Sequence, residues 1–64
     1  MTQKELAYFE DAIGHEKNII SICEESLKKI EDNSIIEFLN KELEIHQNTK
    51  DKLLNKLEEK ANEW

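Results

Sequence analysis

The arrangement of this chain depends on residues 27–39, which read LKKIEDNSIIEFL. At their centre stand Asp32, Asn33 and Ser34, short polar side chains that compete with the backbone for hydrogen bonds. The chain has no proline and one glycine, so this cluster is its one clear turn signal. Ser34 followed by Glu37 also fits a capping box, which begins a helix. The stretch therefore predicts a turn at residues 32–34 between two helices.

The helix boundaries follow from this turn and from the N-terminus. Thr2 followed by Glu5 fits another capping box, so we expect a first helix over about residues 3–31 and a second over about residues 35–62. At about 1.5 Å per residue, each helix would be on the order of 40 Å long. Residues 1–64 are therefore expected to form a single helical-hairpin domain.

Apolar residues recur at alternating spacings of three and four in both predicted helices. In the first, the pattern runs through Leu6, Phe9, Ile13, Glu16, Ile20, Cys23, Leu27 and Ile30. In the second, it runs through Ile36, Leu39, Leu43, His46, Lys50, Leu53 and Leu57. This alternation is typical of the contact seam of a left-handed helical bundle. The fold class that we expect is all-α, an antiparallel two-helix hairpin that dimerises into a four-helix bundle.

The length of the chain supports the expectation of a dimer. A chain of 64 residues is near the size at which a single hydrophobic core is too small to stabilise a fold. Hydrophobic residues make up 38% of the chain, which a two-helix hairpin alone cannot bury well. A partner, and most simply a second copy of the chain, is therefore expected.

Composition excludes several classes of protein. The single cysteine, Cys23, cannot form an internal disulfide, which excludes a disulfide-stabilised secreted domain. No apolar run reaches the roughly 18 residues of a membrane span, and the N-terminus lacks a signal peptide, so we expect a soluble cytoplasmic chain with no membrane partner. The nine basic residues are scattered and are outnumbered by 15 acidic ones, which argues against binding to nucleic acid. The small size leaves little room for a substrate cleft, so we expect no enzymatic activity.

Polar residues interrupt both seams. Glu16 breaks the first seam, and His46 and Lys50 break the second. If the hairpin folds about Asn33, Glu16 pairs with Lys50 and Ile20 with His46, so the two breaks meet at one level. In a two-fold dimer the Glu16 and His46 of a second copy can reach the same layer.

This polar layer has two interpretations. In the first, Glu16, His46 and Lys50 form a hydrogen-bonded ionic layer that fixes the register of the helices. In the second, Glu16 and His46 from two chains bind a metal such as iron, manganese or zinc, as inward-facing carboxylates and imidazoles do in four-helix bundles. Further ligands, or groups that orient the imidazoles, would then be Glu42, His15 and Asp11.

Two further residues lie near the layer. Cys23 occupies a seam position, where we expect a buried and unreactive thiol. Gly14 either allows the close approach of another helix or is a tolerated glycine that costs about 1 kcal/mol.

Two stretches of the sequence resemble a known family. Residues 4–17, KELAYFEDAIGHEK, with CEE at residues 23–25, are similar to the opening helix of small spore-coat-like proteins of endospore-forming bacteria. Residues 42–47, ELEIHQ, followed by LL at residues 53–54, resemble their second helix. These proteins are relatives of the spore coat protein F group and belong to the wider ferritin-like helical set.

The resemblance implies half of a ferritin-like bundle that dimerises and is associated with the spore or its coat, with other coat or sporulation proteins as partners. Glu16 and His46 match positions at which ferritin-like relatives hold metal, although Leu43 stands where those relatives have a Glu three residues before the His. The function we expect is therefore a non-catalytic structural or assembly protein. The alternatives are a ferritin-like protein that binds iron or manganese, and a regulatory adaptor hairpin that binds the helix of a partner.

Overall fold

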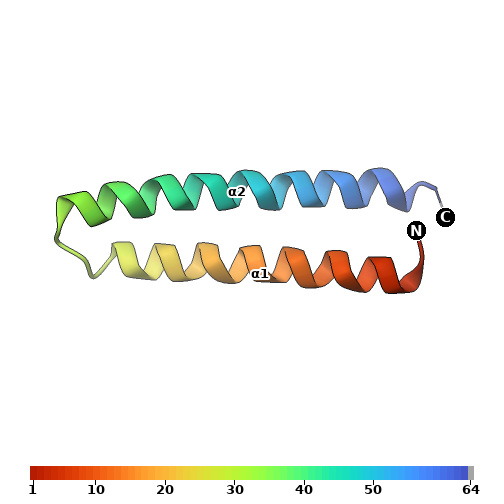
Figure 1. Cartoon of the computed structure of the whole chain (residues 1–64), viewed down its shortest axis with the longest axis horizontal. Coiled ribbons are helices and arrows are strands. Elements are labelled where there is room, and N and C mark those ends of the chain that lie inside the picture. The colour runs from red at the N-terminus through yellow and green to blue at the C-terminus, as the bar shows by residue number, and fades with distance from the viewer. Residues whose placement is uncertain (64) are drawn as a thin grey trace.

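Two antiparallel helices lie side by side in the computed structural model, which describes residues 1–63 and leaves Trp64 outside (Figure 1). Helix α1 spans Gln3–Leu27, and helix α2 spans Asn33–Ala61. The hairpin measures 48 × 15 × 11 Å, and the part of the chain that is described contains no strand. Neither helix is both long enough and apolar enough to cross a membrane. The predicted all-α hairpin is confirmed.

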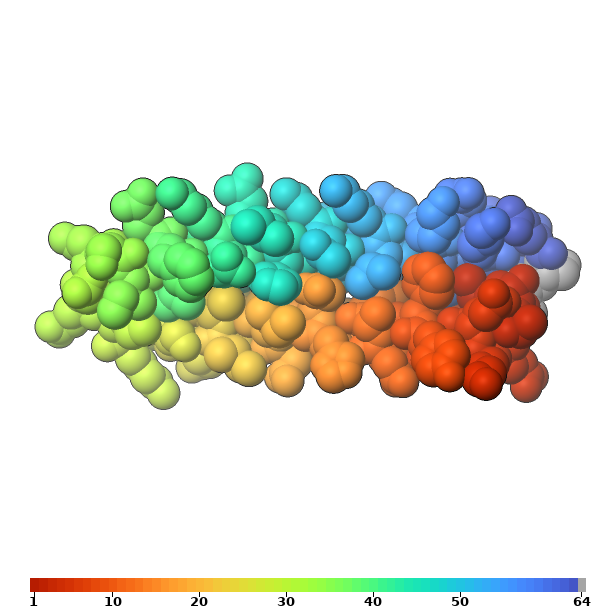
Figure 2. Space-filling model, in the orientation of Figure 1, coloured from red at the N-terminus to blue at the C-terminus, as the bar shows by residue number. Residues whose placement is uncertain are grey.

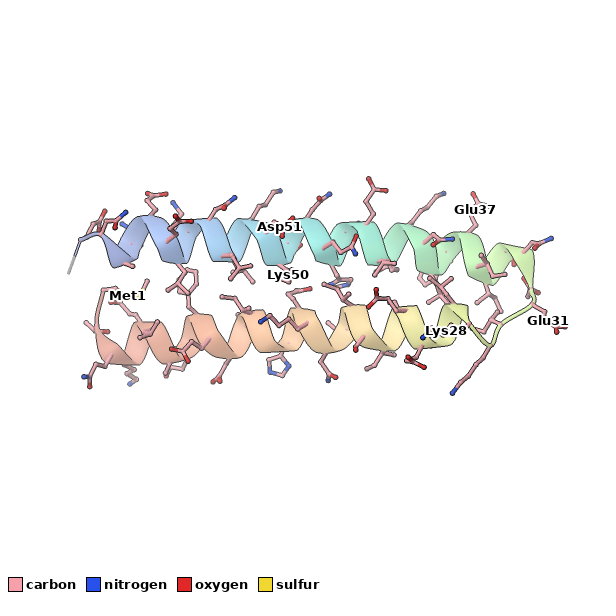
Figure 3. All side chains as sticks on the ribbon, turned by 180° about the vertical axis from the view of Figure 1, so that it is seen from behind. Met1, Lys28, Glu31, Glu37, Lys50 and Asp51 are labelled. Carbon is pink, nitrogen blue, oxygen red and sulfur yellow. The ribbon has the colours of Figure 1, made fainter. Side chains whose placement is uncertain are left out.

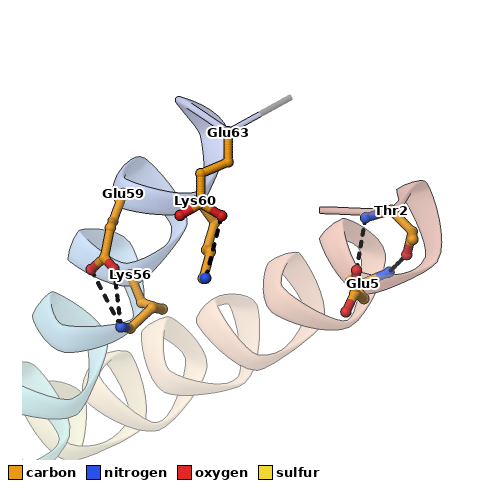
Figure 4. Close-up of polar contacts among 6 residues, drawn as sticks. All are labelled: Thr2, Glu5, Lys56, Glu59, Lys60 and Glu63. Carbon is orange, nitrogen blue, oxygen red and sulfur yellow. Dashed lines mark hydrogen bonds and ion pairs between the residues drawn. The ribbon is translucent and has the colours of Figure 1, made fainter.

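The N-terminus of α1 forms the predicted capping box (Figure 4). The backbone N–H of Glu5 donates to Thr2 Oγ1 at 3.1 Å, and the backbone N–H of Thr2 donates to Glu5 Oε1 at 2.8 Å. These contacts satisfy two N–H groups that the first turn of a helix leaves without partners. The hydrogen bond from the Thr2 backbone, followed by that from its side chain, lowers the pKa of Glu5 below its ordinary value of 4.5.

The start of α2 differs from the prediction, because Asp32 and not Ser34 is the N-cap. Asp32 Oδ1 accepts hydrogen bonds from Ser34 Oγ at 2.7 Å and from the backbone N–H groups of Ser34 and Ile35 at 2.9 and 3.1 Å. Glu37, the expected partner of Ser34 in a capping box, instead pairs with Lys41 at 3.4 Å. A carboxylate accepts several charge-assisted hydrogen bonds at once, which favours Asp32 over the hydroxyl of Ser34 as the cap.

Helix α1 also ends earlier than expected, at Leu27 and not near residue 31. The backbone N–H groups of Lys29 and Ile30 both donate to the Ser26 carbonyl, which closes the last turn, and residues 28–32 then connect the helices. Ile30 is half-buried at this end of the hairpin. Because Asp32 must be extended to cap α2, the chain leaves the α1 helix before it reaches residue 31.

The core of the hairpin is small. Among residues 1–63, the buried ones are Ile13, Ile20 and Cys23, all on α1. Side chains of the two helices meet along the length of the hairpin (Figure 2). Each helix is covered by the other on one side only, which leaves most seam residues partly open to solvent. The leucines of the α2 seam are consequently only half-buried. Glu37 points away from α1, whereas Lys50 lies on the side of α2 that faces it (Figure 3).

Candidate functional site

The polar residues of the two seams meet in the middle of the hairpin. His46 Nδ1 of α2 lies 2.5 Å from Glu16 Oε2 of α1, and these side chains are 24% and 16% exposed. The prediction that the two polar breaks lie at one level is therefore confirmed for Glu16 and His46.

The predicted pairing within this layer was wrong, because Glu16 contacts His46 and not Lys50. Pairing Glu16 with Lys50 assumed that the hairpin folds about Asn33, whereas Glu31 stands halfway between Glu16 and His46 in the sequence. This shift of the fold centre follows from the early end of α1 and from the N-cap at Asp32. Ile20, the predicted neighbour of His46, is buried in the seam one turn further along α1.

A second carboxylate lies on the other side of the imidazole. Glu42, one turn before His46 on α2, has its Oε2 3.5 Å from His46 Nε2. The ring of His46 therefore lies between two carboxylates, one from each helix. We call Glu16, Glu42 and His46 the imidazole cluster.

The geometry of the imidazole cluster suits a structural role. Each ring nitrogen faces a carboxylate oxygen, and the contact between His46 Nδ1 and Glu16 links α2 to α1. No side-chain polar atom is buried without a partner in the described part of the chain. A half-buried cluster of paired polar groups of this kind specifies one register of the helices.

The remaining candidate ligands lie away from the imidazole cluster. Asp11 and His15 are exposed and take no part in its hydrogen bonds or ion pairs. Lys50 is half-buried, and within residues 1–63 it forms none of the observed ion pairs. Nowhere in the region that the structure describes are three or more His, Cys, Asp or Glu side chains arranged to hold a metal ion.

Several large apolar side chains outside the seams are exposed. They are Tyr8, Ile22, Ile35, Phe38, Ile45 and Leu54. Most of these residues were not predicted as a functional feature, because they lie outside the two seams. The signal that could have found them is a second alternation of three and four, one position before each seam residue.

Comparisons with protein-family models, with curated proteins and with solved structures gave no match for this chain. The resemblance to spore-coat-like proteins therefore stays a prediction.

Proposed function

We propose that this protein is a non-catalytic structural or assembly protein that functions as a homodimer, with two hairpins forming a four-helix bundle. The observation that carries the proposal is the imbalance between three buried residues and six large exposed apolar side chains in the described chain. Association of two hairpins would cover both the open side of the seams and many of these side chains.

Magnitudes favour association over an isolated hairpin. Ordering a residue costs about 1.5 kcal/mol, whereas apolar burial returns about 25 cal/mol per Å². A core of Ile13, Ile20 and Cys23 with half-buried leucines leaves much of this cost uncompensated. Burial of each further large apolar side chain at an interface would contribute about 1.5–3 kcal/mol.

In the proposed bundle the imidazole cluster has a structural role. Its three side chains select one register within each hairpin, so that the same apolar residues are presented by every copy. A spore or spore-coat setting, with other coat or sporulation proteins as partners, is part of the proposal and rests on the sequence resemblance alone.

Sedimentation equilibrium at micromolar concentration tests the proposal. We expect a species of twice the 7.6 kDa mass of the chain, with the helical content of the hairpin retained. A folded monomer at these concentrations would contradict the proposal. A monomer that forms a stoichiometric complex with another protein would instead favour the adaptor alternative.

A second candidate function is the binding of iron, manganese or zinc, for which the imidazole cluster of one hairpin is not arranged by itself, so a second copy would have to supply further ligands. Two carboxylates and an imidazole are ligand types that these metals accept, and a second copy would double their number. Elemental analysis of protein isolated without chelators tests this candidate. His46→Ala should abolish any bound metal, whereas His15→Ala, at an exposed position outside the cluster, should retain it. Absence of metal in the unsubstituted protein would contradict it.

A further inference from the structure

The exposed apolar side chains are not spread evenly around the hairpin. Five of the six, all except Leu54, stand one position before a seam residue in the sequence. On α1, Tyr8 and Ile22 precede Phe9 and Cys23. On α2, the residues Ile35, Phe38 and Ile45 precede Ile36, Leu39 and His46.

These five residues share one broad face of the hairpin. Two antiparallel helices are related by an approximate two-fold axis that is perpendicular to the plane containing both helix axes. A rotation about this axis exchanges the helices but keeps each broad face of the hairpin on its own side. Residues one position before the seam on α1 therefore lie on the same face as residues one position before the seam on α2. The structure bears this out at the terminal end, where Tyr8 of α1 and Lys56 of α2, each one position before a seam residue, line one surface depression. We call this side of the molecule the apolar face.

The opposite face is acidic. Residues one position after the seams include Glu10, Glu24, Glu37, Glu44, Asp51 and Glu58, all exposed. Leu54 is the large apolar side chain that lies among them. With a net charge of −6, two copies repel each other through these acidic faces and are expected to meet through the apolar ones.

The apolar face itself has two unlike halves. Ile19, Ile22, Ile35, Phe38 and Ile45 all lie in the half next to the turn, and we call them the turn-half patch. Thr49 marks its border, with its hydroxyl donating to the Ile45 carbonyl at 3.0 Å. Beyond Thr49 the α2 positions of this face are Lys52 and Lys56. Glu5 and Tyr8 are the corresponding positions of α1 at the terminal end.

This asymmetry distinguishes two ways of packing one hairpin on another. With the turns at the same end, the turn-half patches of the two copies cover each other. Lys56 of one copy then lies at the level of Glu5 and Tyr8 of the other, which pairs opposite charges. With the turns at opposite ends, full overlap would place Lys52 and Lys56 against the turn-half patch, which would take two ammonium groups out of water over apolar side chains. Lys56 pairs with Glu59 at 3.3 Å, so this arrangement would remove that exposed ion pair from water as well.

We propose that two copies associate through the apolar face with both turns at the same end of the bundle, so that α1 of each copy packs antiparallel to α2 of the other. The inference rests on the proposed function, since it assumes that the associating partner is a second copy. Among the α2 positions of this half of the apolar face, the carboxylate Glu42 already faces His46 Nε2, so it does not enter the interface as an isolated charge. Glu25 and Lys29 line one surface depression with Ile22, and both are exposed.

Distances between spin labels test the arrangement. The label sites are Glu31→Cys in the turn and Asn62→Cys at the other end, each in the full chain with Cys23→Ala so that one thiol is present. Helix axes in bundles are about 8–10 Å apart. We therefore expect the two labels at residue 31, one on each copy, to lie within about 30 Å of each other, and likewise the two labels at residue 62. A separation near or above the 48 Å length of the hairpin for either pair would overturn the proposed arrangement.

Charge substitutions on the two faces give an independent test. Ile45→Lys, on the apolar face, should weaken self-association about ten- to hundred-fold, because the dimer loses the burial of the exposed half of two large apolar side chains, one from each copy. Leu54→Lys is the matched control on the acidic face, and we expect its dissociation constant to stay within about twofold of the unsubstituted value. Equal weakening by both, or weakening by Leu54→Lys alone, would overturn the choice of face.

These experiments distinguish a failure of the proposed function from a failure of the same-end arrangement. The proposed function itself would be contradicted if both the Cys23→Ala chain and the unsubstituted chain sediment as monomers. A dimer with distant labels would leave the proposed function intact and would contradict the same-end arrangement only.

Discussion

Gly14 is the residue whose substitution has the clearest expected effect. It lies in the interior of α1, and a Cβ added there would meet no atom within 4 Å. Within the hairpin, the close helix approach that the sequence left open is therefore not found at Gly14. In the proposed dimer it also lies one position after a seam residue, away from the apolar face.

Gly14→Ala should therefore stabilise the protein. An alanine loses less backbone entropy than a glycine on entering a helix, which is worth about 0.5–1 kcal/mol in the free energy of unfolding. Chemical denaturation of both proteins at the same concentration measures this difference. A loss of stability on substitution would show that Gly14 has a close neighbour in the native assembly.

Asp32 determines where α2 begins, and it makes the stability of that cap depend on pH. The hydrogen bond from the Ser34 side chain, followed by those from the backbone N–H groups of Ile35 and Ser34, lowers the pKa of Asp32 below its ordinary value of 3.8. A carboxyl whose pKa is lowered on folding stabilises the protein above the unfolded pKa. That contribution is lost as the pH falls through the folded pKa.

Asp32→Asn isolates this effect, because asparagine is also a good N-cap but does not titrate. We expect the melting temperature of the unsubstituted protein to exceed that of the variant at about pH 6, and the difference to shrink towards about pH 2. Thermal unfolding followed by circular dichroism at both pH values measures the difference. A gap between the two melting temperatures that does not change with pH would contradict the assigned role of Asp32.

At the scale of the helical elements, the pair Glu16–His46 is the principal polar link between α1 and α2. Both side chains are more than three-quarters covered, so removal of one leaves the other without its partner in a partly desolvated position. We expect Glu16→Leu and His46→Leu each to lower the free energy of unfolding by about 1–3 kcal/mol. The double variant should lose less than the sum, with a coupling of about 0.5–3 kcal/mol.

A double-mutant cycle by chemical denaturation, at equal protein concentrations, measures this coupling. The exposed pair Lys28–Glu25 at 3.2 Å provides the matched control, for which we expect about 0.2–1 kcal/mol or less. Strict additivity at Glu16 and His46 would contradict a direct link between the helices.

The sequence was sufficient to predict the elements but not their detailed pairing. The alternation of apolar residues predicted both helices, and the polar cluster at residues 32–34 located the turn to within a few residues. The pairing of Glu16 with Lys50 was wrong because it depended on which of Asp32 and Ser34 caps α2. That choice is a competition among hydrogen bonds a few residues apart, and a small shift of the cap moves every pair along the seam.

At the scale of the whole molecule, the hairpin has too little core for its exposed apolar surface. The apolar face, the acidic face and the small set of buried residues are all accounted for if folding is coupled to association of two copies. The dimer was predicted from the length of the chain, and it stays a prediction because a single chain carries no contact with a second copy.

Coupling between folding and association is tested most directly by thermal unfolding at different protein concentrations. Circular dichroism would follow the loss of helix over a roughly hundred-fold range of concentration. We predict a melting temperature that rises with protein concentration, because unfolding of a dimer releases two chains. A melting temperature that is independent of concentration, with a folded monomer throughout the range, would contradict the account.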